Sequence, residues 1–166
     1  MALLIRKATA ADAPQILAFI HALAEYEKAP DAVEATVADL VREGFGPTPR
    51  FHCLLAESDD QPSGYALYFH TYSTWTGHAG LHLEDLFVLP EFRGKGVGKA
   101  LIAAVAAIAR AEHCRRLEWA VLDWNQPAID FYRSLGGEFL DEWRTVRLTG
   151  PALETLATRQ TAEEKQ

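Results

Sequence analysis

The stretch Glu91–Ile102, EFRGKGVGKALI, sets the fold of this chain, because three glycines stand directly before an alanine-rich apolar run. The run LHLEDLFV, residues 81–88, predicts a strand before the glycines, and the alanine-rich run predicts a helix to about Glu112. Backbone N–H groups in such a turn can approach an anion closely, and the helix dipole favours negative charge there. A glycine-rich turn that binds no ligand is the alternative.

The spacing of the glycines excludes two common phosphate-binding loops. A Walker A loop with its Gly-Lys pair at Gly98-Lys99 would need a glycine at Arg93 and a hydroxyl at Ala100, and the sequence has neither. A dinucleotide fingerprint needs G-x-G-x-x-G, whereas these glycines alternate with single residues. The preceding strand also carries two carboxylates, unlike the apolar central strand of a dinucleotide-binding fold.

Hydrophobic periodicity elsewhere predicts a mixed α/β domain around one sheet. Further strands are expected at 3–8, 51–57, 65–71 and 117–121, and one or two strands at 139–148. Further helices are expected around 16–24, 33–44, 127–136 and 151–157. The strand, helix and strand around the glycines should form a parallel, right-handed unit. Residues 1–157 are predicted to form one domain, followed by a polar tail at 158–166.

The composition narrows the classes of partner. A formal net charge of −7 disfavours binding to nucleic acid or to an anionic membrane, and it is compatible with a cationic small molecule. The same acidity also fits a surface whose charge only aids solubility. Two cysteines exclude a disulfide framework and a Cys-rich zinc site, and they favour a cytoplasmic protein. There is no signal-peptide layout, and the longest apolar run, 100–109, is too short for a membrane span.

Two motifs together resemble a known family. The first is R-x-x-G-x-G at 93–98, and the second is N-x-x-A-x-x-F-Y at 125–132. In order and spacing they resemble the GNAT superfamily of acetyl-CoA-dependent N-acetyltransferases, and the resemblance runs from the first strand to about Ala157. The segments LEDLFV, YSTW and VLDWNQPAIDFY resemble the diamine (spermidine/spermine) N-acetyltransferase subfamily, and within it the branch that acetylates thialysine.

The resemblance implies a fold and a cosubstrate. The expected fold is a single GNAT domain with a mostly antiparallel central sheet, a parallel β-α-β core that binds coenzyme A, and splayed strands. The expected cosubstrate is acetyl-CoA, without a metal, and the subfamily implies a homodimer. The residues that the resemblance assigns to coenzyme A are Phe87, Val88, Arg93, Gly94, Lys95, Gly96, Val97, Gly98, Lys99, Asn125 and Tyr132.

Glu84 is the leading candidate for the base that deprotonates the attacking amine. It stands beside Asp85 in an otherwise apolar strand, and strict alternation would send the two carboxylates to opposite faces. The resemblance implies a β-bulge here, which could turn both toward one cleft, where they would attract a cationic amine. The resemblance also implies that Glu84 acts through water. The alternative is a solvent-facing acidic pair at a strand end.

The resemblance assigns the remaining catalytic roles. Backbone N–H groups of Phe87 or Val88 would stabilise the oxyanion, and Tyr132 would act as general acid toward the leaving sulfur. The local sequence also allows Tyr132 to be a packing residue beside Phe131, and Asn125 to be a helix-entry residue.

Other chemistries find little support in the sequence. His82 and Glu84 match H-x-E, but the P-C-x-x-C partner of zinc deaminases is missing. His78, His82 and Glu84 lie in one predicted strand, and this spacing is weak support for a metal site. No G-x-S-x-G nucleophile motif occurs, and Cys53 lies in an apolar strand. We therefore expect direct acetyl transfer in a ternary complex, without a covalent enzyme intermediate.

The acceptor site is expected to include Tyr26, Glu27 and Trp75, together with Glu84 and Asp85. Polyamine enzymes of the subfamily carry an acidic residue in the segment that matches Tyr72–Trp75, where this chain has Ser73 and Thr74. This difference favours thialysine or a similar lysine- or ornithine-like amine over a long polyamine. A polyamine or diamine acetyltransferase is the main alternative. A protein N-acetyltransferase and a noncatalytic acyl-CoA-binding sensor are further alternatives.

Overall fold

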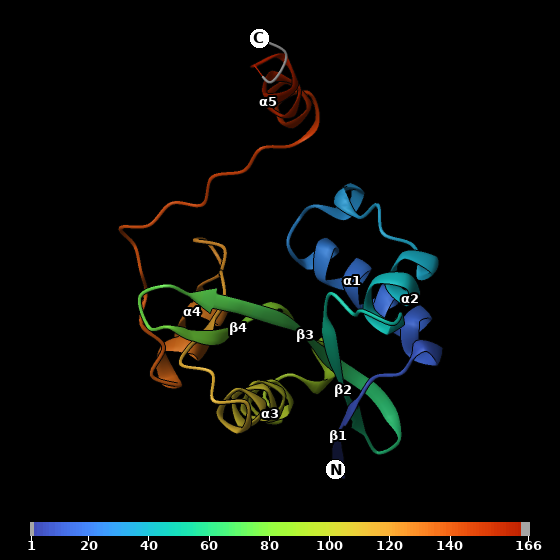
Figure 1. The fold of residues 1–166 in the computed structure, drawn as a ribbon. Coiled ribbons are helices and arrows are strands. Elements are labelled where there is room, and N and C mark those ends of the chain that lie inside the picture. The colour runs from blue at the N-terminus through green and yellow to red at the C-terminus, as the bar shows by residue number, and fades with distance from the viewer. Residues whose placement is uncertain (1, 164–166) are drawn as a thin grey trace. The chain divides into compact units, whose positions relative to one another are not determined.

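A computed structural model describes residues 2–163, with side chains described to residue 158. The chain divides into two compact units, of which the first ends at Ala120 and the second begins at Val121. The first unit contains β1 (Leu3–Lys7), α1 (Ala13–Tyr26), α2 (Val37–Phe45), β2 (His52–Ser58), β3 (Gln61–Ser73), β4 (His78–Val88), α3 (Val97–Ala111) and β5 (Leu117–Glu118). The second contains α4 (Gln126–Ser134) and α5 (Gly150–Glu163) (Figure 1).

The sheet of the first unit confirms the expected fold class. Its five strands lie in the order β1-β2-β3-β4-β5, antiparallel from β1 to β4. β4 and β5 pair in parallel over Leu81 and His82, and α3 connects them. The glycine-rich stretch therefore lies between β4 and α3, inside the parallel β-α-β unit that the sequence predicts.

Helices cover both faces of this sheet (Figure 1). On the face covered by α1 and α2, the core contains Ala13, Ile16, Phe19, Leu40, Cys53, Leu55, Tyr65, Leu67 and Phe87. Strand alternation directs Leu54, Ala66, Leu81 and Leu83 to the other face, where α3 contributes the buried residues Val97, Leu101, Ile102 and Val105.

Local chemistry explains where α2 begins. Thr36 is its N-cap and forms a capping box with Asp39: the threonine hydroxyl accepts the Asp39 N–H at 3.2 Å, and the Asp39 carboxylate accepts the Thr36 N–H at 3.0 Å. The helix therefore starts at Val37, so Val33, which the apolar spacing places within the helix, lies before it.

Three sequence expectations fail in the C-terminal part of the chain. Residues 139–148 contain no strand, and the strand expected at 117–121 is reduced to Leu117–Glu118. The apolar pattern of 139–148 fits a strand, but a strand forms only where a neighbouring strand supplies hydrogen-bond partners. The final helix, α5, continues to Glu163 instead of ending at Ala157, so residues 158–163 of the predicted tail are helical. Residues 164–166 of that tail lie outside the described residues.

Candidate functional site: a glycine loop beside two carboxylates

The glycine loop leaves space for a ligand in front of α3. A 3-10 turn, Pro90–Phe92, follows β4, and Gly94 and Gly96 then adopt φ angles of +71° and +86°. A Cβ atom added at either glycine would meet no heavy atom within 4 Å. The first N–H groups of an α-helix have no partner inside the helix, so those of α3 face this space. The loop therefore has the open space and the N–H donors that phosphate groups bind at helix N-termini in other proteins.

Arg93 does more in this loop than supply positive charge. Its Nε donates a hydrogen bond to the carbonyl of Val88 at 2.9 Å. Its guanidinium lies 4.7 Å from the ring centre of Tyr26 and 5.5 Å from that of Phe87. The Arg93 side chain thus joins the loop to the end of β4 and to the end of α1. Lys95 contributes the second cation of the loop and lies 5.5 Å from the ring centre of Phe92.

The expected β-bulge is present in β4, at Glu84. Leu83 pairs with Tyr68 and Asp85 pairs with Leu67, so Glu84 has no opposite residue on β3. An extra residue of this kind changes the alternation of side chains along the strand. The bulge therefore decides which face of the sheet the two neighbouring carboxylates share.

Contacts on both sides of the bulge show that Glu84 and Asp85 lie on the face covered by α1. The carboxylate of Glu84 is 3.5 Å from His82 Nε2, and the His82 ring lies 5.1 Å from that of Phe69. The carboxylate of Asp85 accepts a hydrogen bond from the Tyr65 hydroxyl at 2.8 Å. Tyr65 and Phe69 are four residues apart on one strand, so they share a face. Two acidic groups therefore meet on the same side of the sheet.

The two carboxylates differ in their surroundings. The Glu84 side chain is 55% exposed, so water reaches it. Asp85 is partly covered, and burial raises the pKa of its carboxyl from 3.8 to about 6. The hydrogen bond from Tyr65 acts in the opposite direction, whereas the negative charges of Glu84 and Glu27 add to the increase in this pKa. The pKa that rises toward neutrality is thus that of Asp85.

The strand register separates the two candidate oxyanion donors. The N–H of Leu89 donates to the carbonyl of Ser63 at 3.0 Å, which makes these two residues a hydrogen-bonded pair. Because such pairs alternate in an antiparallel ladder, Phe87 directs its N–H toward β3 and Val88 directs its N–H toward the opposite edge. β5 pairs with β4 at Leu81–His82, well before Val88. The geometry therefore favours the Val88 N–H as a donor to a ligand at this edge.

The structure brings two of the three acceptor-site candidates near these groups. Tyr26, at the end of α1, touches Arg93, and the charge of Glu27 acts on both Asp85 and Tyr65. Partial desolvation raises the pKa of Glu27 itself. Trp75 instead lies in the β3–β4 turn, beyond His78, and its side chain is 83% exposed. The strand from His78 to Glu84 covers about 20 Å, so Trp75 is not brought to the two carboxylates.

The second unit carries the other two predicted residues on one helix. Asn125 is the N-cap of α4, and its side-chain oxygen accepts the Ala128 N–H at 3.4 Å. The helix-entry role left open by the sequence is therefore present. Asn125, Ile129 and Tyr132 are buried and follow helical spacing, so they lie along one face of α4. The Tyr132 ring lies 5.3 Å from that of Phe131, as the packing alternative expects.

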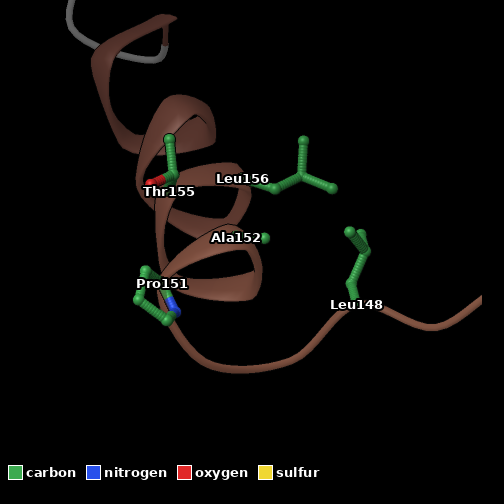
Figure 2. A pocket seen from close by; sticks show the side chains of 5 residues that line it. All are labelled: Leu148, Pro151, Ala152, Thr155 and Leu156. Atoms are coloured by element: carbon green, nitrogen blue, oxygen red, sulfur yellow. The ribbon is translucent and has the colours of Figure 1, made fainter.

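A shallow hollow in the second unit offers different chemistry. Figure 2 shows the side chains that line it: Leu148, Pro151, Ala152, Thr155 and Leu156. None of these is ionisable, so they can neither deprotonate an amine nor bind a cation by charge. Within residues 2–163, no cluster of three or more His, Cys, Asp and Glu side chains could hold a metal. No helix in the same range is long and apolar enough to cross a membrane.

Comparison with known proteins agrees with the fold and the loop. Residues 16–137 match the Acetyltransferase (GNAT) family. The chain belongs to this family and is an acetyltransferase. Members of the family use acetyl-CoA as cosubstrate.

Two curated relatives and one solved structure illustrate the similarity. The chain is 44% identical to the thialysine N-epsilon-acetyltransferase of Sus scrofa, over 93% of this chain and 96% of the relative. It is 43% identical to the human spermidine/spermine N(1)-acetyltransferase-like protein 1, over 80% of this chain and 20% of the relative. An integron cassette protein from V. cholerae has a similar structure, with a TM-score of 0.78, 27% identity, and coverage of 95% and 98% of the two chains.

The loop geometry gives a first prediction, on Gly96→Ala. The added methyl group would strain the positive φ angle by roughly 1–2 kcal/mol and stand in the space before α3. We expect the Kd for coenzyme A, measured by titration calorimetry, to rise about tenfold or more. Gly77→Ala is the matched control, because Gly77 has a φ of +66° and the same open surroundings in the β3–β4 turn. Equal loss of coenzyme A affinity in both variants would contradict the assignment.

Proposed function

We propose that this protein transfers an acetyl group from acetyl-CoA to the primary amine of a small, lysine- or ornithine-like molecule, with thialysine as the favoured acceptor. The observation that carries this proposal is the bulge at Glu84, which sets two carboxylates on one face of β4. The same strand leads directly into the glycine loop. An acidic acceptor site and an anion-binding donor site thus lie along one stretch of chain.

Acetyl-CoA, when bound, supplies the acetyl group as a thioester, and the N–H groups at the start of α3 would hold its phosphates. A lysine-type amine has a pKa of about 10.4 and must lose a proton before it attacks. Glu84 is exposed enough to remove this proton through water, as the resemblance implies. Asp85 and Glu27 would attract the cationic form of the amine and orient it.

The remaining steps fall to a backbone group and to the second unit. The Val88 N–H, directed away from β3, would donate to the carbonyl oxygen as negative charge develops on it. Tyr132 would give its hydroxyl proton to the departing sulfur, and Asn125 would bind coenzyme A. In this scheme the amine attacks the acetyl group directly, and no enzyme side chain becomes acetylated.

The acceptor is tested by comparing substrates. We expect kcat/KM for thialysine to exceed that for spermidine by about tenfold or more, because Ser73 and Thr74 offer no negative charge to the far end of a polyamine. Rates of coenzyme A release with thialysine, lysine, ornithine, spermidine and a peptide set would give the ranking. A preference for spermidine would support the polyamine alternative, which the similarity to a spermidine/spermine acetyltransferase-like protein favours.

From the resemblance we also propose a homodimer. From the cysteines we propose a cytoplasmic protein, and from the net charge of −7 one that binds neither nucleic acid nor membranes. Cys53 and Cys114 are both free thiols, which fits a reducing compartment. Burial raises the pKa of the Cys53 thiol to about 12, which keeps it protonated and unreactive. This supports direct transfer over a mechanism with a cysteine nucleophile.

A further inference from the structure

We propose that Tyr65 is a positioning residue for acyl transfer, whose hydroxyl fixes the carboxylate of Asp85 as the anionic partner of the incoming amine. This inference rests on the function proposed above. Tyr65 lies in the apolar strand GYALYF, and nothing in that pattern distinguishes it from a core aromatic residue. Its role follows from its position across the sheet from the bulge.

The Tyr65 ring is held rigidly. The residue is 0% exposed, and its ring stacks on Phe19 of α1 with centroids 5.5 Å apart and planes 5° from parallel. The hydroxyl donates to Asp85 Oδ2 at 2.8 Å. Because the ring cannot rotate without disturbing α1, the hydroxyl can hold the carboxylate in one orientation. Such rigidity is a requirement for a group that positions another.

The bulge is what brings the two groups together. Tyr65 pairs with Phe87, and Leu67 pairs with Asp85, so the Asp85 carboxylate lies diagonally across from the Tyr65 ring. If Glu84 were paired in regular register instead of bulged, alternation would place Asp85 on the face of α3, away from the Tyr65 hydroxyl. The bulge that places Glu84 and Asp85 on one face therefore also makes possible the hydrogen bond from Tyr65 that orients Asp85.

The charges around Asp85 oppose its ionisation, so the hydrogen bond from Tyr65 affects the pKa of this carboxyl. Glu84 on the same strand and Glu27 after α1 both repel the ionised carboxylate, and the Cys53 thiol on β2 is within electrostatic range. Arg93, from the loop, lies over the neighbouring Phe87 ring. Burial and the two acidic neighbours raise the pKa of Asp85 to about 6, and the Tyr65 hydrogen bond restrains that increase. Without the hydroxyl, Asp85 would remain protonated into the neutral range.

Tyr65→Phe tests the inference, because it removes the hydroxyl and keeps the ring. A lost hydrogen bond to a charged group corresponds to a pKa increase of about one unit. At pH 6.5 we expect Tyr65→Phe to have a KM for the amine about threefold above that of wild type. At pH 8.5, where Asp85 is ionised in both proteins, the two KM values should be nearly equal. Tyr68→Phe is the matched control, since Tyr68 is buried on the same strand and lies against His52 on the other face.

A titration of Asp85 itself gives a readout that does not depend on turnover. The carboxyl carbon signal of Asp85, assigned by its loss in Asp85→Asn, should titrate about one pH unit higher in Tyr65→Phe than in wild type. In an Asp85→Asn background, Tyr65→Phe should leave the pH dependence of the KM unchanged. Thermal unfolding of each variant checks that the fold is kept.

The outcomes separate this inference from the proposed function. If wild type acetylates small amines, but Tyr65→Phe shows an unchanged Asp85 titration or an unchanged pH dependence of the KM, the inference is wrong. If wild type acetylates no small amine, the proposed function is wrong, and the inference falls with it even if the titration confirms the contact. A threefold effect that persists equally at pH 6.5 and 8.5 would indicate a structural defect and would also overturn the inference.

Discussion

Replacing Tyr132 with phenylalanine is expected to lower kcat for acetyl transfer by about a hundredfold, the lower end of the range for a lost general acid. A phenol has a pKa of about 10, so the Tyr132 hydroxyl still carries its proton at neutral pH and can donate it to the sulfur as the bond between carbon and sulfur breaks. Phenylalanine keeps the aromatic ring beside Phe131 and Ile129, so α4 should remain folded. Steady-state kinetics at saturating amine and acetyl-CoA would measure the effect.

Coenzyme A binding provides the control for Tyr132→Phe. The Kd of the variant for coenzyme A should stay within about twofold of wild type, because a single peripheral hydrogen bond contributes little to a ligand of this size. Tyr72 is an exposed tyrosine near the β3–β4 turn, so Tyr72→Phe should change neither kcat for acetyl transfer nor the Kd for coenzyme A. Unchanged turnover in Tyr132→Phe would leave Tyr132 as a packing residue, the alternative that the sequence allows.

Replacing Asp85 with asparagine is expected to make the protein more stable and less active. At pH 7.5 we expect the free energy of unfolding to rise by about 3 kcal/mol, because wild type loses stability when a carboxyl whose pKa is raised from 3.8 to about 6 ionises in the fold. The asparagine oxygen can still accept the hydrogen bond from Tyr65. We expect kcat/KM for a cationic amine to fall by about tenfold or more, since the site loses its less solvated negative charge.

The pH dependence gives Asp85→Asn its sharpest test. Between pH 3.8 and about 6, folded wild type retains a proton that the unfolded chain has released, so wild type loses stability as the pH rises through this window. The stability gain of the variant should therefore be small near pH 4 and complete above pH 6.5. Denaturant unfolding at several pH values would measure it, with Asp60→Asn, an exposed turn residue, as the control. A gain that does not change with pH would exclude Asp85 ionisation as its cause.

These variants would show where function opposes stability in this enzyme. A half-buried carboxylate next to Glu84 and near Glu27 is unfavourable for folding, because burial and both negative charges oppose its ionisation. Its presence is explained if the negative charge serves a cationic acceptor. Residues that lower stability in this way are expected at functional sites.

The sequence determined the fold class and the position of the glycine loop. The strand 81–88, the glycines and the alanine-rich helix are neighbours along the chain, so periodicity and spacing suffice to predict the parallel β-α-β unit and the glycine-rich turn inside it. The residues 139–148 show the limit of such reasoning. Their alternation fits a strand, but periodicity records which face of a segment is apolar, and it does not record whether another strand lies alongside.

The acceptor side depends on contacts that only the tertiary structure decides. The sequence places Glu84 and Asp85 next to each other, but their shared face depends on the register between β3 and β4, which are joined across a long hairpin. The partnership of Tyr65 with Asp85, twenty residues apart, follows from that register. The stretch EFRGKGVGKALI could be interpreted alone because its geometry is local, whereas the charge and orientation of a carboxylate depend on what the whole sheet packs around it.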